Sequence, residues 1–134
     1  MKRTLIDTNV LLDVLTNDPT WSQWSAEQLD LASADSELCI NAVIYAEVSM
    51  GFERIEDLDQ AMDPALFSRL ELPWEAAFLA GKAFLRYRRA KGERRSPLPD
   101  FFIGAHAAID GMTLLTRDSR RYRSYFPSLK LICP

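Results

Sequence analysis

The stretch Leu5-Ile6-Asp7-Thr8-Asn9-Val10-Leu11-Leu12 decides the fold. Residues 4–6 form a short apolar run that is typical of a buried strand. The run stops at Asp7, and the two residues after it are of types that begin helices. Apolar residues then recur at helical spacing as far as Leu15. The pattern predicts a strand, a helix, and a carboxylate between them that either ligates a cation or caps the helix.

The bulk properties indicate an ordinary folded domain. The chain has 134 residues, of which 48% are hydrophobic and 26% charged, so we expect a single domain over residues 1–134. No apolar run is long enough to span a membrane and no leader pattern opens the chain, so we expect no membrane contact and a cytoplasmic location. Cys39 and Cys133 lack metal-type spacing, so two unpaired thiols are expected.

Charge is distributed unevenly along the chain. Residues 1–81 hold 15 acidic and 4 basic side chains, whereas residues 82–134 hold 12 basic and 4 acidic ones. This asymmetry favours a surface on the second half that faces a polyanion. The net charge of only -3 argues against a protein that coats nucleic acid indiscriminately.

Strand and helix patterns alternate along the chain. Strands are expected near residues 4–6, 37–41, 69–72, 113–116 and 129–132, and helices near residues 8–15, 19–34, 42–52, 55–67, 74–91, 100–110 and 119–126. In the helix at 74–91 the apolar spacing places Trp74 and Phe78 in the core. Such alternation predicts an α/β fold with a mostly parallel sheet and helices on both faces.

Four carboxylates occupy distinctive positions. Asp7 and Asp118 end strands, Asp100 begins a helix, and Glu47 lies among apolar residues of another helix. Carboxyl ends of parallel strands meet at one edge of the sheet, where clustered acids repel one another and a divalent cation relieves the repulsion. Oxygen ligands without sulfur select Mg²⁺ or Mn²⁺. The alternative is that the three aspartates are helix caps and Glu47 a surface residue.

Four motifs in order resemble the PIN domain family, and most closely its VapC-type toxins. They are residues 5–12, Ala46-Glu47-Val48, residues 99–107 and residues 114–122. Each motif alone is weak, whereas the four in this order and spacing over the whole chain are specific. The resemblance implies a three-layer α/β/α sandwich and a metal-dependent endoribonuclease.

The resemblance also implies roles for individual residues and partners. It carries over Asp7, Glu47, Asp100 and Asp118 as the acidic quartet that binds Mg²⁺ or Mn²⁺, with Asn9 and Thr116 as supporting residues. In such enzymes a metal-activated water molecule attacks the phosphate and displaces the 3′-oxygen. The product carries a 5′-phosphate, and the RNA 2′-hydroxyl takes no part. The toxin type implies RNA as substrate, a cognate antitoxin that binds an apolar groove near the early helices, and a homodimer.

Basic residues near the acids are candidates for RNA contact. Arg94 and Arg95 precede Asp100, and Arg117 precedes Asp118. Because carboxylates repel phosphate, arginines around them would let an RNA backbone approach. The alternative is a solvated surface with cations at a helix carboxyl end. His106 is the only histidine, so a histidine-based acid–base mechanism is disfavoured and a packed or surface role is expected.

Other functions fit less well or remain open. A phosphatase of the DxDxT type is disfavoured because Asn9 replaces its second acid, and a receiver domain lacks its late lysine and its paired acid here. Two alternatives to the toxin stay open: a PIN-type nuclease that processes RNA without an antitoxin, and a non-catalytic module that only binds RNA.

Overall fold

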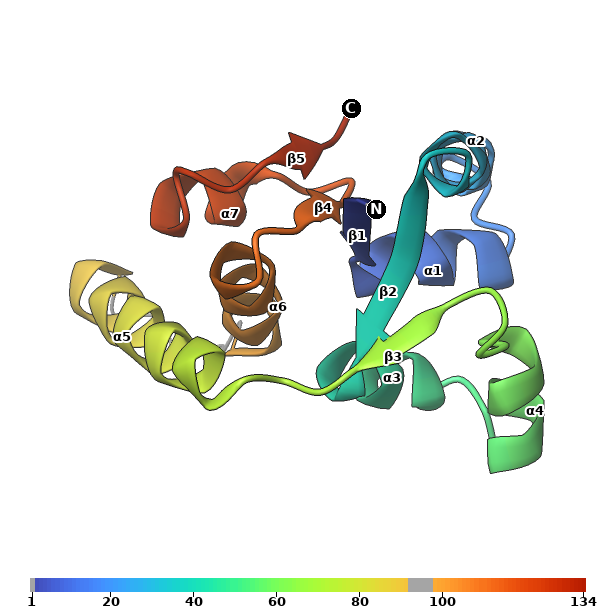
Figure 1. The fold of residues 1–134 in the computed structure, drawn as a ribbon, viewed down its shortest axis with the longest axis horizontal. Helices are drawn as coiled ribbons and strands as arrows, with labels where there is room; N and C mark the ends of the chain where they lie inside the picture. Colours follow the sequence, from blue (N-terminus) through green and yellow to red (C-terminus); the bar gives the residue numbers. More distant parts are fainter. Residues whose placement is uncertain (1, 92–97) are drawn as a thin grey trace.

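A five-stranded parallel sheet forms the centre of the protein. The computed structural model describes residues 2–91 and 98–134 (Figure 1). The strands are β1 (Lys2–Ile6), β2 (Ser36–Asn41), β3 (Ser68–Leu70), β4 (Thr113–Leu115) and β5 (Leu131–Ile132). Their order is β3-β2-β1-β4-β5, and every neighbouring pair is parallel. The buried Leu5 of β1 aligns with Cys39 of β2 and with Leu114 of β4 on one face of the sheet. The next residues, Ile6 and Leu115, point to the other face and are also buried, so the centre of the sheet is apolar on both faces.

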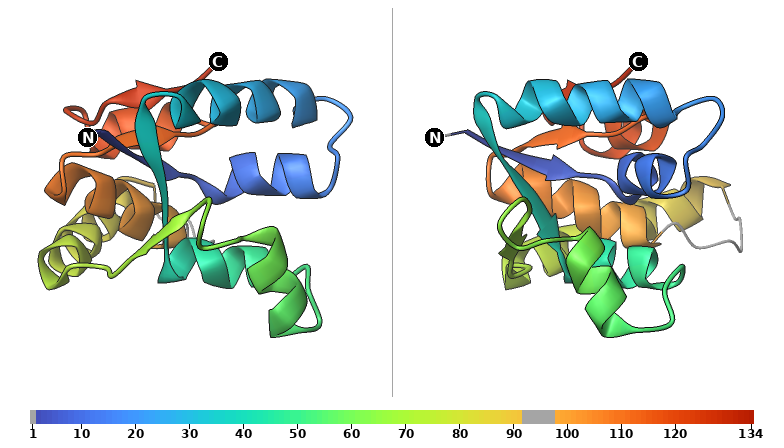
Figure 2. Two further views of the ribbon diagram at one scale, coloured as in Figure 1. Left: turned by 45° about the vertical axis from the view of Figure 1, so that its right-hand side comes forward. Right: turned by 90° about the vertical axis from the view of Figure 1, so that its right-hand side faces the viewer.

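Helices connect all of these strands. They are α1 (Thr8–Leu15), α2 (Ser22–Ser33), α3 (Ala42–Ser49), α4 (Ile55–Ala61), α5 (Trp74–Lys91), α6 (Leu98–Ile109) and α7 (Arg120–Tyr125). The strand order runs outward from β1 to β3, then restarts at β4 on the other side of β1. Right-handed crossovers in opposite directions place helices on opposite faces, as seen for α1 and α2 against α5, α6 and α7 (Figure 2). The predicted α/β sandwich with a parallel sheet is therefore confirmed.

Local signals account for where several helices begin. The Asp7 carboxylate accepts a hydrogen bond from the Thr8 N–H at the start of α1, and Asn41 Oδ1 accepts one from the Ile44 N–H in α3. Helix α2 begins at Ser22, three residues after Pro19, because the Asp18 carboxylate first organises a turn by accepting from the N–H groups of residues 20 and 21. Helices α3 and α4 end earlier than the sequence pattern predicted.

Helix α5 has the predicted bounds, but the prediction of its buried face was wrong. Trp74 is 87% exposed and Phe78 is 69% exposed. The residues that α5 buries are Ala76, Ala80, Ala83 and Tyr87. Small side chains on this face allow α5 to approach α6 closely, so the larger aromatic rings lie outside. Both cysteines are free, as expected, and among residues 2–91 and 98–134 no helix is long and apolar enough to cross a membrane.

Gly104 of α6 packs closely against the rings of Tyr122 in α7 and of Phe126, which directly follows it. A Cβ atom at this position would lie 2.7 Å from two ring carbons of Phe126 and 3.0 Å from the ring of Tyr122. We expect Gly104→Ala to lower the free energy of unfolding by about 1–3 kcal/mol, because both rings must move. Gly81→Ala is the matched control, since nothing lies within 4 Å of a Cβ there. It should stabilise α5 by about 0.5–1 kcal/mol. Urea unfolding of both variants checks this, and a Gly104→Ala protein as stable as the parent would contradict it.

Candidate functional site

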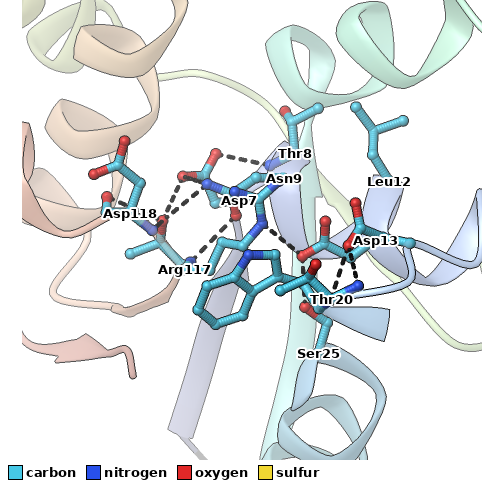
Figure 3. Close-up of polar contacts among 12 residues, drawn as sticks. Asp7, Thr8, Asn9, Leu12, Asp13, Thr20, Ser25, Arg117 and Asp118 are labelled. Carbon is cyan, nitrogen blue, oxygen red and sulfur yellow. Dashed lines mark hydrogen bonds and ion pairs between the residues drawn. The ribbon is translucent and has the colours of Figure 1, made fainter. Parts of the chain in front are cut away.

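Asp7 lies at the carboxyl end of β1, where its side chain is 3% exposed. One carboxylate oxygen, Oδ1, accepts from the Thr8 N–H at 2.7 Å. The other, Oδ2, accepts from the Thr116 hydroxyl at 2.8 Å and from the Tyr122 hydroxyl at 2.9 Å. Asp7 is thus both the cap of α1, next to Thr8 in Figure 3, and a buried carboxylate that residues from the end of β4 and from α7 contact.

The environment of Asp7 favours its protonated form. The pKa of Asp7 is raised to about 7, chiefly by burial and next by the charge of Asp100. The hydrogen bonds from Thr116, Tyr122 and the backbone lower this pKa, but burial outweighs them. The pKa of Tyr122 is raised well above its usual value, chiefly by burial, so its hydroxyl remains a donor to Asp7.

The two predicted supporting residues connect the ends of β1 and β4. The Asn9 amide donates to Thr116 Oγ1 at 3.3 Å and to Asp7 Oδ2 at 3.4 Å, and its carbonyl oxygen accepts from the Arg117 N–H at 3.3 Å. Thr116 is fully buried, and its hydroxyl oxygen accepts from the Asp118 N–H at 3.1 Å. These contacts fix the position of Asp118 relative to Asp7, while the Asp118 side chain itself remains exposed.

Glu47 reaches the same edge of the sheet from α3. Its Oε1 atom accepts from the Thr8 hydroxyl at 2.6 Å, one residue away from Asp7. The helix that carries it is fixed at its start by Asn41, whose amide also contacts His106 Nδ1 at 3.0 Å. The Glu47 carboxylate is therefore held at the start of α1, whereas the alternative interpretation of the sequence made it a surface residue.

Asp100 lies in the first turn of α6 and is paired with an arginine. Arg121 Nη1 donates to Asp100 Oδ2 at 2.5 Å, and both side chains are about a third exposed, 33% and 34% respectively. Burial raises the pKa of Asp100. The Arg121 charge lowers this pKa, and the charges of Glu47 and Asp118 raise it. The four predicted acids therefore lie within electrostatic reach of one another through Asp7 and Asp100.

The donor chemistry of this cluster fits a hard divalent cation. Its ligands are carboxylates without sulfur, and Asp7 and Asp100 have raised pKa values that a bound cation would reverse. The residues that would hold the ion are Asp7, Glu47, Asp100 and Asp118. In the part of the chain that the structure describes, no three His, Cys, Asp or Glu side chains are already gathered into a metal site. A metal ion held by all four acids would require their side chains to move closer together, and Asp100 is restrained by its ion pair with Arg121.

Of the three arginines predicted to contact RNA, the structure describes only Arg117. Arg94 and Arg95 lie outside the described residues. The Arg117 side chain forms an ion pair with the buried Asp13, Nε to Oδ2 at 2.8 Å, and Ser25 also donates to this oxygen (Figure 3). The Arg117 guanidinium lies 5.7 Å from the ring centre of Trp21. The Arg117 guanidinium therefore contacts Asp13 in α1 and the ring of Trp21 at the start of α2. Its position next to Asp118 in the sequence gave no sign of these contacts.

His106 is fully buried, so the packed role that the sequence allowed is the one observed. Because Asn41 Oδ1 already accepts from a backbone N–H, its amide nitrogen donates to His106 Nδ1. His106 Nε2 then carries the proton and donates to Asp110 Oδ2 at 3.0 Å. Burial lowers the pKa of this histidine, consistent with a neutral ring that joins α6 to the start of α3.

The comparisons with known proteins show the family and the fold of the chain. A family model described as the PIN domain matches residues 4–126. The chain belongs to the PIN domain family. Among curated proteins, no sequence matches this PIN domain.

Several solved structures share its fold. VapBC2 from Rickettsia felis, bound to a DNA fragment from its promoter, superposes with a TM-score of 0.72 at 18% identity and 97% coverage of both chains. DNA-bound VapBC from Salmonella typhimurium gives 0.69 at 20% identity, covering 99% of this chain and 98% of the other. A toxin–antitoxin complex from Klebsiella pneumoniae gives 0.67 at 19% identity, covering 96% and 95%. At these identities the likeness establishes the PIN fold.

Proposed function

We propose that this PIN domain is a metal-dependent endoribonuclease, with residues 1–134 acting as one nuclease domain. The observation that supports it most is Asp7, a buried carboxylate at the carboxyl end of β1 whose pKa is raised to about 7 and whose charge is coupled to Asp100. A carboxylate kept in such a costly environment is typical of an active site. Mg²⁺ or Mn²⁺ would satisfy it.

The residues of the chain have distinct roles in this proposal. Thr116 and Tyr122 hold Asp7 in place by donating to Oδ2, and Thr8 holds Glu47. Asp7, Asp100 and Asp118 would bind the ion directly or through water, and Glu47 would bind a second ion or orient the attacking water. When bound, the metal supplies an activated water and neutralises charge on the phosphate. The bond to the 3′-oxygen breaks, and the product carries a 5′-phosphate.

RNA would approach across basic and apolar surfaces beside the acids. Arg94, Arg95 and Arg117 are the proposed phosphate contacts, of which Arg117 would have to act from its ion pair with Asp13. An apolar groove of about 360 Å³ adjoins Glu47 and includes Pro99 and the half-buried ring of Phe102. An aromatic ring in an apolar groove can stack with unpaired bases, which suits a single-stranded substrate.

The proposal extends to the biological setting of the enzyme. Solved structures with this fold include VapBC complexes and a toxin–antitoxin complex, which favours a VapC-type toxin inhibited by a cognate antitoxin. We also propose that the protein forms a homodimer and acts in the cytoplasm. The exposed rings of Trp74 and Phe78 on α5 provide apolar surface that a second protein chain would bury.

Cleavage of total cellular RNA by the antitoxin-free protein tests the proposed activity. With Mg²⁺ or Mn²⁺ we expect discrete fragments with 5′-phosphate ends, which EDTA abolishes. Glu47→Gln should lower the rate by about 10–100-fold, whereas Glu53→Gln removes the same charge from an exposed position and should have no effect.

Three results would contradict the proposal. Cleavage that survives EDTA would exclude the metal mechanism, and 2′,3′-cyclic phosphate ends would show attack by the RNA 2′-hydroxyl. RNA that is bound and remains intact would favour the non-catalytic module. Cleavage as proposed, by a protein that binds no antitoxin, would favour the RNA-processing nuclease.

A further inference from the structure

Arg121 places a positive charge of the chain itself inside the acidic cluster. It lies in the first turn of α7, directly before Tyr122, whose hydroxyl donates to Asp7. Its Nη1 atom donates to Asp100 Oδ2 at 2.5 Å, and its guanidinium carbon lies 5.7 Å from the ring centre of Tyr87. Arg121 is therefore held between an aromatic ring and one of the proposed metal ligands.

The ion pair competes with a metal for the same oxygen. Among the charges around Asp100, that of Arg121 offsets the charges of Glu47 and Asp118. A divalent cation that binds Asp100 through Oδ2 must therefore displace the guanidinium. Since both side chains are about a third exposed, the pair is stabilised only moderately by its environment and can open toward solvent.

We propose that Arg121 is an exchangeable cation: it holds Asp100 when no metal is bound, and it moves to the phosphate of RNA when a metal takes Asp100. This inference rests on the proposed function of the site. The chemistry of the released side chain supports the second step, because a planar guanidinium with several N–H donors binds phosphate oxygens in pairs. Because Arg121 lies beside Asp100, it brings a positive charge next to the proposed metal, where the other charged side chains are carboxylates.

Metal affinity and RNA cleavage should change in opposite directions when Arg121 is replaced. In Arg121→Gln, Asp100 is free, so Mn²⁺ should bind about 3–10-fold more tightly by isothermal titration calorimetry. RNA cleavage at saturating Mn²⁺ should fall by about 10–100-fold, because the phosphate loses its guanidinium. A residue that only supported the fold would lower both quantities.

Two further variants separate the effect of the Arg121 guanidinium from that of net charge. Arg120→Gln removes the same charge from the adjacent exposed position of α7, and we expect its Mn²⁺ affinity to stay within about twofold of the parent. Arg121→Lys keeps the charge and loses the planar fork, so it should retain a parent-like Mn²⁺ affinity and still cleave RNA more slowly. Circular dichroism confirms that each variant is folded.

The outcomes distinguish this inference from the proposed function. If the parent protein binds Mn²⁺ and cleaves RNA but Arg121→Gln binds Mn²⁺ no more tightly, the exchange is wrong and the nuclease proposal stands. An equal gain in affinity for Arg120→Gln would also overturn the exchange, because the effect would then be one of net charge. If the parent neither binds Mn²⁺ nor cleaves RNA, both proposals fail.

Discussion

Replacement of Asp7 by asparagine is expected to lower RNA cleavage by on the order of 100-fold or more. The substitution keeps the shape of the side chain and the capping oxygen that accepts from the Thr8 N–H. It removes the negative charge that would hold the metal. The Tyr122 hydroxyl can also accept, so it can rotate to pair with the new amide. The Thr116 oxygen already accepts from Asn9 and Asp118, but its hydroxyl can turn its proton toward the Asp118 carbonyl oxygen. The variant should therefore fold and fail in catalysis.

The control for this variant is Asp30→Asn, which removes the same charge from an exposed position on α2. Single-turnover cleavage of a defined RNA with Mn²⁺, together with a melting curve for each protein, gives the comparison. Asp30→Asn should cleave at the parent rate. An Asp7→Asn protein that cleaves within about threefold of the parent would contradict a metal role for this carboxylate.

The second large effect concerns pH and the stability of the metal-free protein. The pKa of Asp7 is raised from its usual value of 3.8 to about 7 in the folded state. Such a group binds its proton more tightly when folded, so its contribution to stability is complete below pH 3.8 and is lost as the pH rises through about 7. Within that window the free energy of unfolding should fall by up to about 1.4 kcal/mol per pH unit from this group.

Urea unfolding in EDTA from pH 4.5 to pH 8, for the parent protein and Asp7→Asn, isolates this effect. His106 acts in the opposite direction below its usual pKa of 6.5, because its folded-state pKa is lowered, but it is present in both proteins. The difference between the two proteins therefore reports Asp7. We expect Asp7→Asn to gain stability relative to the parent as the pH rises, up to about pH 7. A difference that does not change with pH would contradict the raised pKa.

The parts of the site that were predictable from sequence depend on local patterns. The boundary at Asp7, the cap at Asn41 and the small-residue helix α6 follow from residue types within a few positions. The order of strands and helices led to the parallel sheet, and hence to strand-end acids at one edge. Glu47 had only a weak local signal, an acid among apolar residues of a helix, and the resemblance of four motifs to the PIN domain family supplied its role.

What the sequence did not indicate depends on packing between distant segments. The burial of Ala80 in place of Phe78 on α5 reflects how closely two helices approach, and an apolar pattern does not encode that distance. Arg117 reaches Asp13 across 104 positions. Arg121 pairs with Asp100 across two helices, α7 and α6, that the aromatic rings of Tyr122 and Phe126 pack together at Gly104.

A crystal of the antitoxin-free protein soaked with Mn²⁺, with anomalous diffraction data collected to locate the metal, tests directly whether the four acids bind a metal ion. We expect an anomalous peak among the carboxylates of Asp7, Glu47, Asp100 and Asp118, at the carboxyl ends of β1 and β4. We also expect Arg121 to have left Asp100. Absence of a peak at this position, at a Mn²⁺ concentration that supports RNA cleavage, would contradict the claim that these acids form a metal centre.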